Sequence, residues 1–139
     1  MRKLLTVAIS LLLGLVAGNA QTPLLTYFEK TQGKESPTYE EIIAWWKKAD
    51  QSSPLLTLQT KGPTDAGFPL HLALLSNMGF TSIYSAKNAG AIIILVNNGI
   101  HPGEPDGIDA SMLLAKKVIE KKLLLPQHIV LAIIPVYNI

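Results

Sequence analysis

The sequence predicts an α/β fold in which a mixed sheet contains a βαβ unit and carries covering helices. Residues 91–96 and 129–136 are continuous apolar runs, typical of buried strands. The segment Asp109–Lys122 between them repeats apolar side chains with the period of a helix. Earlier in the chain, two alternating segments flank a stretch rich in turn formers and predict an antiparallel hairpin. A length of 139 residues limits this fold to one domain or part of one.

Residues 1–20 have the features of a secretory signal peptide. Arg2 and Lys3 precede the apolar run Leu4–Val16, and Gly18-Asn19-Ala20 places small residues before a cleavage point. The apolar run has about 13 residues, fewer than the roughly 20 that cross a bilayer. It also lacks the polar face of a buried core helix. We therefore expect a protein exported to the periplasm or the cell exterior, without a stable membrane anchor.

The charge of the remaining chain is balanced. Ten lysines and no arginine follow residue 20, against ten acidic residues. A formally neutral chain argues against a nucleic acid or an anionic membrane as a partner held by net charge. The sequence contains no cysteine, which excludes disulfides, thiolate metal ligands and a cysteine nucleophile. The sequence also has no arginine after Arg2, and arginine is the residue that usually binds a carboxylate through two parallel hydrogen bonds.

The first half of the chain predicts a lead-in, a helix and the hairpin. Residues 21–37 are polar and indicate an irregular lead-in segment, so the domain is expected to span 38–139. Thr38 and Glu41 fit a capping box at the start of a helix that ends near Asp50. The two strands of the hairpin are expected at Leu55–Thr60 and Pro69–Leu75, with a turn over Gly62–Gly67 between them.

The second half predicts the βαβ unit. The run at 91–96 is too apolar for a strand with one wetted face, so we expect it to be covered on both sides. In the helix, one face carries Ile108, Met112, Ala115 and Ile119, while Lys116, Lys117, Glu120 and Lys121 fall away from it. A strand, a helix and a strand in this order imply parallel neighbours joined by a right-handed crossover. The chain stops at Ile139, directly after a strand that should be central, which indicates a truncated sequence.

The chemistry-bearing stretch is Asn97–Gly107, between the first apolar strand and the helix, where open parallel sheets place ligands. His101 and Glu104 stand three apart in a bend rich in glycine and proline, so an imidazole and a carboxylate can meet at one centre. Both are good zinc ligands, and a catalytic zinc site needs three protein ligands and an open position. The alternative is a solvated histidine beside a glutamate that favours the helix N-terminus.

Other polar residues near this motif have competing interpretations. Asp106 and Asp109 are candidates to orient His101 by accepting a hydrogen bond from its second ring nitrogen. The favoured interpretation of each is a charge or cap at the start of the helix. His71 and His128 fall inside or at the start of predicted strands, where a structural or edge role is expected rather than metal binding.

On these motifs, the segment Thr38–Asn138 resembles the zinc carboxypeptidases of the M14 family. The resemblance rests on a helix, a hairpin turn with two glycines before a proline, and a buried strand leading into Gly-x-His-x-x-Glu. Here these are matched by Gly62–Pro69 and by Gly99–Glu104, and the final strand leads through a proline to Asn138. The resemblance implies a zinc-carboxypeptidase-like fold truncated after its first strands, with His101 and Glu104 as the first two zinc ligands.

The sequence also departs from the family pattern. Gly103 and Phe68 stand where many members have arginines. The family's third zinc ligand, its substrate-binding arginines and its glutamate general base lie beyond the last strand of this chain. The resemblance therefore implies metal-assisted hydrolysis of peptide or amide bonds in a complete enzyme. We expect this chain, as written, neither to hold zinc tightly nor to cleave peptides.

Two further functions remain open. One is a zinc deacylase of the aspartoacylase type, which shares the same motif but is disfavoured by the signal peptide. The other is a non-catalytic binding module on the same scaffold. Substrate side-chain preference and oligomeric state are not encoded in any motif of this sequence.

Overall fold

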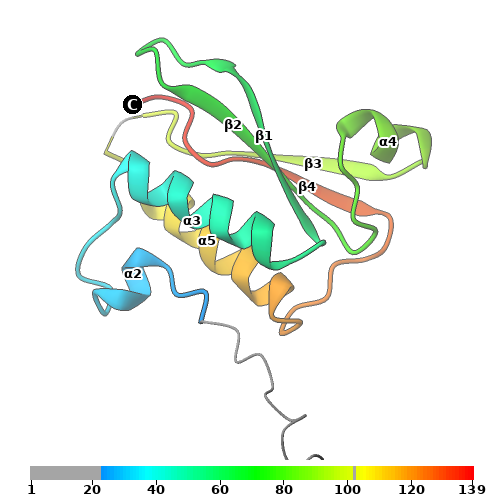
Figure 1. Ribbon diagram of the computed structural model, residues 1–139, viewed down its shortest axis with the longest axis horizontal. Helices are drawn as coiled ribbons and strands as arrows, with labels where there is room; N and C mark the ends of the chain where they lie inside the picture. The colour runs from blue at the N-terminus through cyan, green and yellow to red at the C-terminus, as the bar shows by residue number, and fades with distance from the viewer. Residues whose placement is uncertain (1–22, 102) are drawn as a thin grey trace, which may run out of the picture.

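The computed structural model describes residues 23–101 and 103–139. The predicted signal peptide, residues 1–20, lies outside this range. The sheet has four strands in the order β1-β2-β4-β3 (Figure 1). Its strands are β1 (Leu56–Pro63), β2 (Pro69–Leu75), β3 (Ile92–Asn97) and β4 (Ile129–Ile134). β1 pairs antiparallel with β2 and β2 antiparallel with β4, while β3 runs parallel to β4. The predicted hairpin, mixed sheet and parallel βαβ pairing are therefore confirmed.

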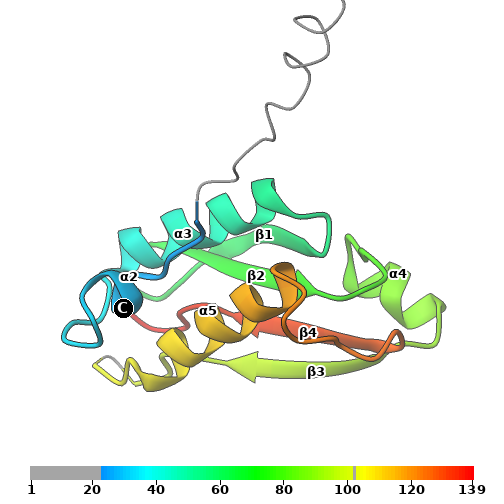
Figure 2. The same cartoon turned by 90° about the horizontal axis from the view of Figure 1, so that it is seen from below.

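In the described residues, four helices accompany the sheet: α2 (Tyr27–Lys30), α3 (Tyr39–Ser52), α4 (Ile83–Asn88) and α5 (Asp106–Ile119). α3 and α5 cover one face of the sheet together, whereas α4 lies at the end of the sheet opposite the turn between β1 and β2 (Figure 2). Two apolar clusters follow this division: the larger joins α3 and α5 to the sheet, and the smaller packs Ala86 of α4 against Leu74, Val130 and Ala132. No helix in the described part of the chain has the length and hydropathy needed to span a membrane.

Helix α3 forms as its sequence predicts. The Thr38 hydroxyl accepts a hydrogen bond from the Glu41 amide at 3.4 Å, and the Glu41 carboxylate accepts one from the Thr38 amide at 2.9 Å. This capping box satisfies amides that lack partners at a helix start. The helix buries Trp46 completely, with the ring of Trp45 edge-on to it at 5.1 Å. It ends at Ser52, slightly beyond the predicted end near Asp50.

The lead-in segment is more ordered than predicted. The expectation of an irregular segment over 21–37 was wrong for α2, which has its own capping box between Thr26 and Glu29. Leu24 and Thr26 are buried, so the described part of this segment packs on the domain. The Thr26–Glu29 spacing is the same local signal as Thr38–Glu41, but a single helical turn adds no apolar periodicity to reveal it.

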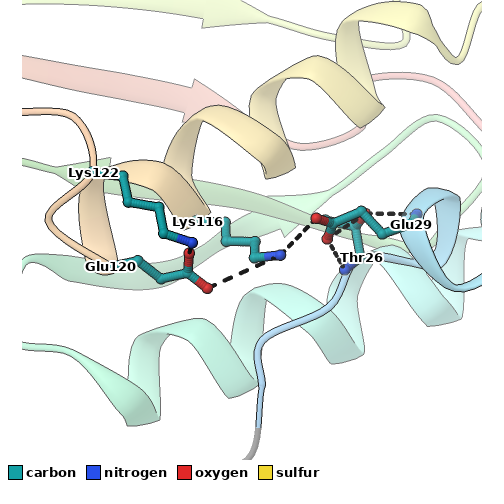
Figure 3. Close-up of polar contacts among 5 residues, drawn as sticks. All are labelled: Thr26, Glu29, Lys116, Glu120 and Lys122. Carbon is teal, nitrogen blue, oxygen red and sulfur yellow. Dashed lines mark hydrogen bonds and ion pairs between the residues drawn. The ribbon is translucent and has the colours of Figure 1, made fainter.

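The face of α5 also differs from the prediction. The helix starts at Asp106, three residues earlier than expected, and Met112 and Ala115 are fully buried as the period predicts. The prediction that Lys116 falls away from the core side was wrong: its side chain is only 11% exposed. Its ammonium lies 2.6 Å from a Glu29 carboxylate oxygen (Figure 3), so α2 supplies the anion that permits this burial.

The largest correction concerns β3. The sequence predicts a strand covered on both sides, yet β3 occupies the edge of the sheet. Ile92 is 55% exposed and Leu95 63%, and Ile94 is also exposed. Apolarity reports what a strand is suited to pack against, and it does not report whether a neighbour is present. β3 therefore has the composition of an interior strand in an edge position, with one side of its backbone open to pairing.

We predict that the Glu29–Lys116 ion pair stabilises the fold only when Glu29 is ionised. Burial raises the pKa of Glu29, but the Lys116 ammonium and the bonds from Thr26 outweigh it, so the pKa lies below its ordinary value of 4.5. The stabilisation is thus complete above about pH 4.5 and is lost as the pH falls through the lowered pKa. Glu29→Gln should lower the free energy of unfolding at pH 7 by about 1 kcal/mol, and this difference should narrow at pH 3.

Denaturant unfolding at the two pH values measures this effect. Lys122→Ala is the control, because it removes only the exposed ion pair between Lys122 and Glu120. A Glu29→Gln deficit that is equal at pH 7 and pH 3 would contradict the assignment.

We also predict that the open edge of β3 drives self-association of the isolated chain. A lysine on an edge strand opposes edge-to-edge pairing, so Leu95→Lys should shift sedimentation velocity profiles toward the monomer. Since Leu95 is already exposed, the cost in stability should be small. Leu124→Lys is the matched control, because Leu124 is 75% exposed but lies outside the sheet. An equal shift toward the monomer with both variants would show that general surface hydrophobicity, and not the strand edge, causes self-association.

Candidate functional site

The candidate site lies where β3 and β4 end, at the same end of the sheet as the hairpin turn between β1 and β2. Asn98 directly follows β3 and is buried, with only 5% of its surface exposed. Its side-chain amide donates to the Ser111 hydroxyl at 3.0 Å and to the Ile134 carbonyl at 3.2 Å. One buried side chain thus joins the end of β3 to α5 and to β4, which fixes the start of the loop that follows.

Two glycines allow the backbone to pass close to this contact. A Cβ added at Gly107 would lie 2.9 Å from the Asn98 side-chain oxygen, so helix α5 can approach Asn98 only with glycine there. Gly99 has a φ of +59°, and a Cβ at that position would lie 3.2 Å from Val136. The sequence alone predicts no role for Asn98. The sequence pattern that could have revealed Asn98 is a side-chain amide just after an apolar strand, with a glycine in the helix that follows.

A tight turn brings His101 and Glu104 together along the backbone. The Glu104 amide donates to the His101 carbonyl at 3.3 Å, and Gly103 has a φ of +88°. This hydrogen bond closes a β-turn, which holds the Cα atoms of its two end residues within about 7 Å. The backbones of His101 and Glu104 are therefore close, and the meeting of their side chains at one centre stays a prediction.

Both candidate ligands are exposed to solvent. Among residues 23–101 and 103–139, no cluster of three or more histidine or acidic side chains could hold a metal ion. The chemistry of the two donors, an imidazole and a carboxylate, fits zinc. The described residues thus offer a pair of donors and lack the third that a catalytic zinc site requires.

Asp109 is engaged elsewhere and does not orient His101. The Ser36 hydroxyl donates to one Asp109 carboxylate oxygen at 2.8 Å, which ties the lead-in segment to α5. The other oxygen is buried without a hydrogen-bond partner in the part of the chain that the structure describes. Burial, together with the nearby charge of Asp106, raises the pKa of Asp109 despite the Ser36 bond. Asp106 is exposed in the first turn of α5. This position fits a charge at the start of the helix rather than an acceptor that orients His101.

The other two histidines have structural surroundings, as expected. His71 is buried in β2, and its ring nitrogen Nδ1 lies 3.2 Å from the Thr60 hydroxyl across the hairpin. Burial lowers the pKa of His71, and the positive charge of Lys47 lowers it further. His128 is exposed just before β4, and its carbonyl accepts a hydrogen bond from the Ile92 amide at 2.7 Å. This contact places His128 at the opposite end of β3 from the turn.

Phe68 anchors the hairpin turn to α3. Its ring meets the ring of Tyr39 edge-on, with centroids 5.2 Å apart. The Tyr39 hydroxyl also donates to the Pro69 carbonyl at 2.6 Å. Phe68 thus contributes packing between the hairpin turn and α3.

The fold matches that of a solved carboxypeptidase. The chain is similar to the crystal structure of carboxypeptidase A from Helicoverpa armigera, with a TM-score of 0.65 and 19% sequence identity. The similarity covers 97% of this chain and 31% of the carboxypeptidase, so the chain spans about a third of the length of that protein. No family model matches the sequence, and no curated protein does. The chain therefore has a carboxypeptidase-like α/β scaffold.

We predict that Asn98 and Gly107 are coupled through their close contact. Alanine in place of a helical glycine normally stabilises by up to about 1 kcal/mol, but here its Cβ would collide with Asn98. Gly107→Ala should therefore destabilise the wild-type chain by about 1 kcal/mol or more. In an Asn98→Ala background, where the obstacle is absent, the same change should be neutral or stabilising.

Denaturant unfolding of the four chains of this double-mutant cycle provides the measurement. Asn98→Ala alone should cost about 2 kcal/mol, since it leaves the buried Ser111 hydroxyl without the side-chain amide. The Ile134 carbonyl keeps its bond from the Asn98 backbone amide. An effect of Gly107→Ala that is equal in both backgrounds would exclude the coupling.

Proposed function

We propose that the chain is the N-terminal portion of an exported zinc-dependent metallocarboxypeptidase, in which His101 and Glu104 are the first two zinc ligands. The place of the His-x-x-Glu turn on a carboxypeptidase-like scaffold carries this proposal. The carboxypeptidase-like scaffold extends over nearly the whole chain, and the His-x-x-Glu turn lies at the carboxyl end of β3, where open α/β sheets bind ligands. Zinc, when bound in such a site, polarises the scissile carbonyl and promotes ionisation of a bound water.

The residues of this chain hold the metal and take no part in proton transfer. The imidazole of His101 and the carboxylate of Glu104 supply one nitrogen and one oxygen donor. Asn98, anchored in the fold, determines where the loop that carries them begins. A third ligand, a carboxylate clamp and a general base have to come from further polypeptide. No arginine follows Arg2 to act as the clamp, and the residue before Glu104 is Gly103.

The open edge of β3 supports this view of the chain as part of a larger sheet. Its exposed aliphatic side chains, Ile92, Ile94 and Leu95, suit a further strand and covering helices. About two thirds of the carboxypeptidase A chain has no counterpart here, since the similarity covers 31% of it. We propose that additional polypeptide of this kind pairs with β3 and completes the site.

We also propose a substrate class and a location for this protein. A peptide or peptide-like amide is the proposed substrate class, with hydrolysis at its C-terminal end. Export rests on the signal-peptide pattern of residues 1–20 in the sequence.

We predict that this chain binds zinc weakly through the proposed pair. With two ligands, the dissociation constant should be roughly 0.1 to 1 mM, which corresponds to about 4 to 5.5 kcal/mol. Zinc titrations followed by NMR chemical shifts should move the signals of His101 and Glu104. His101→Ala and Glu104→Ala should each abolish these shifts. The chain should not hydrolyse an N-blocked dipeptide with a free C-terminus at any zinc concentration.

His128→Ala serves as the control, because it removes an exposed histidine at the other end of β3. Zinc binding that survives His101→Ala, or that is lost with His128→Ala, would refute the assignment. Tight stoichiometric zinc or peptide hydrolysis by this chain would refute the need for further ligands.

A further inference from the structure

The segment after β4 runs beside the segment after β3, at the end of the sheet that carries His101 (Figure 1). The Tyr137 amide donates to the Asn98 carbonyl at 2.9 Å, and the Asn138 amide donates to the Gly99 carbonyl at 2.9 Å. The Asn138 side-chain amide then donates to the Ile100 carbonyl at 2.6 Å. Residues 137–138 thus bind three consecutive carbonyls that lead directly to His101.

The last of these bonds differs from the other two. The bonds to Asn98 and Gly99 use backbone amides, so most substitutions would preserve them. The bond to the Ile100 carbonyl uses the side chain of Asn138 and depends on that residue type. Because the peptide unit is planar, holding the Ile100 carbonyl also sets the direction from which the backbone enters His101.

Side-chain packing provides little restraint at this point. Ile100 is 47% exposed, and His101 is also exposed. The neighbouring Gly99, in contrast, is closely surrounded by Val136 and Ile108. The backbone therefore leaves the packed region at Gly99. Beyond it, the Asn138 side-chain amide, in the segment that follows β4, restrains the backbone at Ile100.

We propose that Asn138 is a positioning residue for the metal-binding turn, holding the Ile100 carbonyl so that the His101 imidazole is presented in a fixed direction. This inference rests on the proposed function, since it assigns His101 to a metal. It adds a residue of the strand-to-loop segment after β4 to a site otherwise drawn from the loop after β3. Groups that orient metal ligands typically change metal affinity by about 10- to 100-fold when they are removed.

Asn138→Asp tests the inference, because it keeps the size of the side chain and removes the donor. The matched control is Asn77→Asp, since the Asn77 side-chain amide likewise donates to a backbone carbonyl, that of Leu125, at the opposite end of the sheet. Asn138→Asp should weaken zinc binding at His101 about tenfold, whereas Asn77→Asp should leave it unchanged. In the metal-free protein, the NMR order parameter of the His101 amide should fall only in Asn138→Asp.

Asn138→Ala provides a second variant without a new charge, and it retains the backbone bond to Gly99. Equal zinc affinity in wild type and both Asn138 variants, or an equal loss with Asn77→Asp, would overturn the inference. If wild type binds no zinc through His101, the proposed function fails. The order parameter then still decides whether Asn138 holds the backbone at His101, and an unchanged value would overturn that part as well.

Discussion

The parallel pairing of β3 with β4, continued beyond the sheet by Asn98, fixes the point from which the loop carrying His101 begins. The pairing runs in unbroken register from Ile92 opposite Ile129 to Asn97 opposite Ile134. The buried amide of Asn98 then bonds both Ile134 and Ser111 of α5. A buried amide with its partners in place is stabilising, and one without them is costly. The loop carrying His101 thus starts from a fixed point because moving it would leave these groups unpaired.

Much of the fold could be predicted because its signals are local. The Thr38–Glu41 capping box, the turn formers between β1 and β2, and the helical period of Met112 and Ala115 each act over a few residues. Helix α4 was not predicted, since its six residues are too few to show a period. Its start is capped by the Ser82 hydroxyl, which accepts a hydrogen bond from the Ser85 amide at 3.0 Å. Such short elements are defined mainly by their tertiary contacts, here the packing of Ala86.

The failures of prediction concern partners that lie far away in sequence. Lys116 is largely buried because it pairs with Glu29, which lies 87 residues away in the sequence. The helical period of α5 cannot predict such a partner. The apolar run of β3 likewise indicates a buried strand. Its side chains are exposed because β3 is the edge strand of the described sheet and has a neighbour only at β4. For the candidate site, the spacing of His101 and Glu104 predicts the turn. It could not reveal Asn138, whose role depends on the return of the chain after β4.

The central claim is that His101 and Glu104 share one metal ion. Anomalous diffraction at the zinc absorption edge, from crystals of the wild-type chain soaked in zinc, tests it most directly. We expect an anomalous peak within bonding distance of both the His101 imidazole and the Glu104 carboxylate, at about 2.0 to 2.2 Å from each. A peak at His71 or His128 with none at the turn, or a peak that contacts His101 while Glu104 points away, would contradict it.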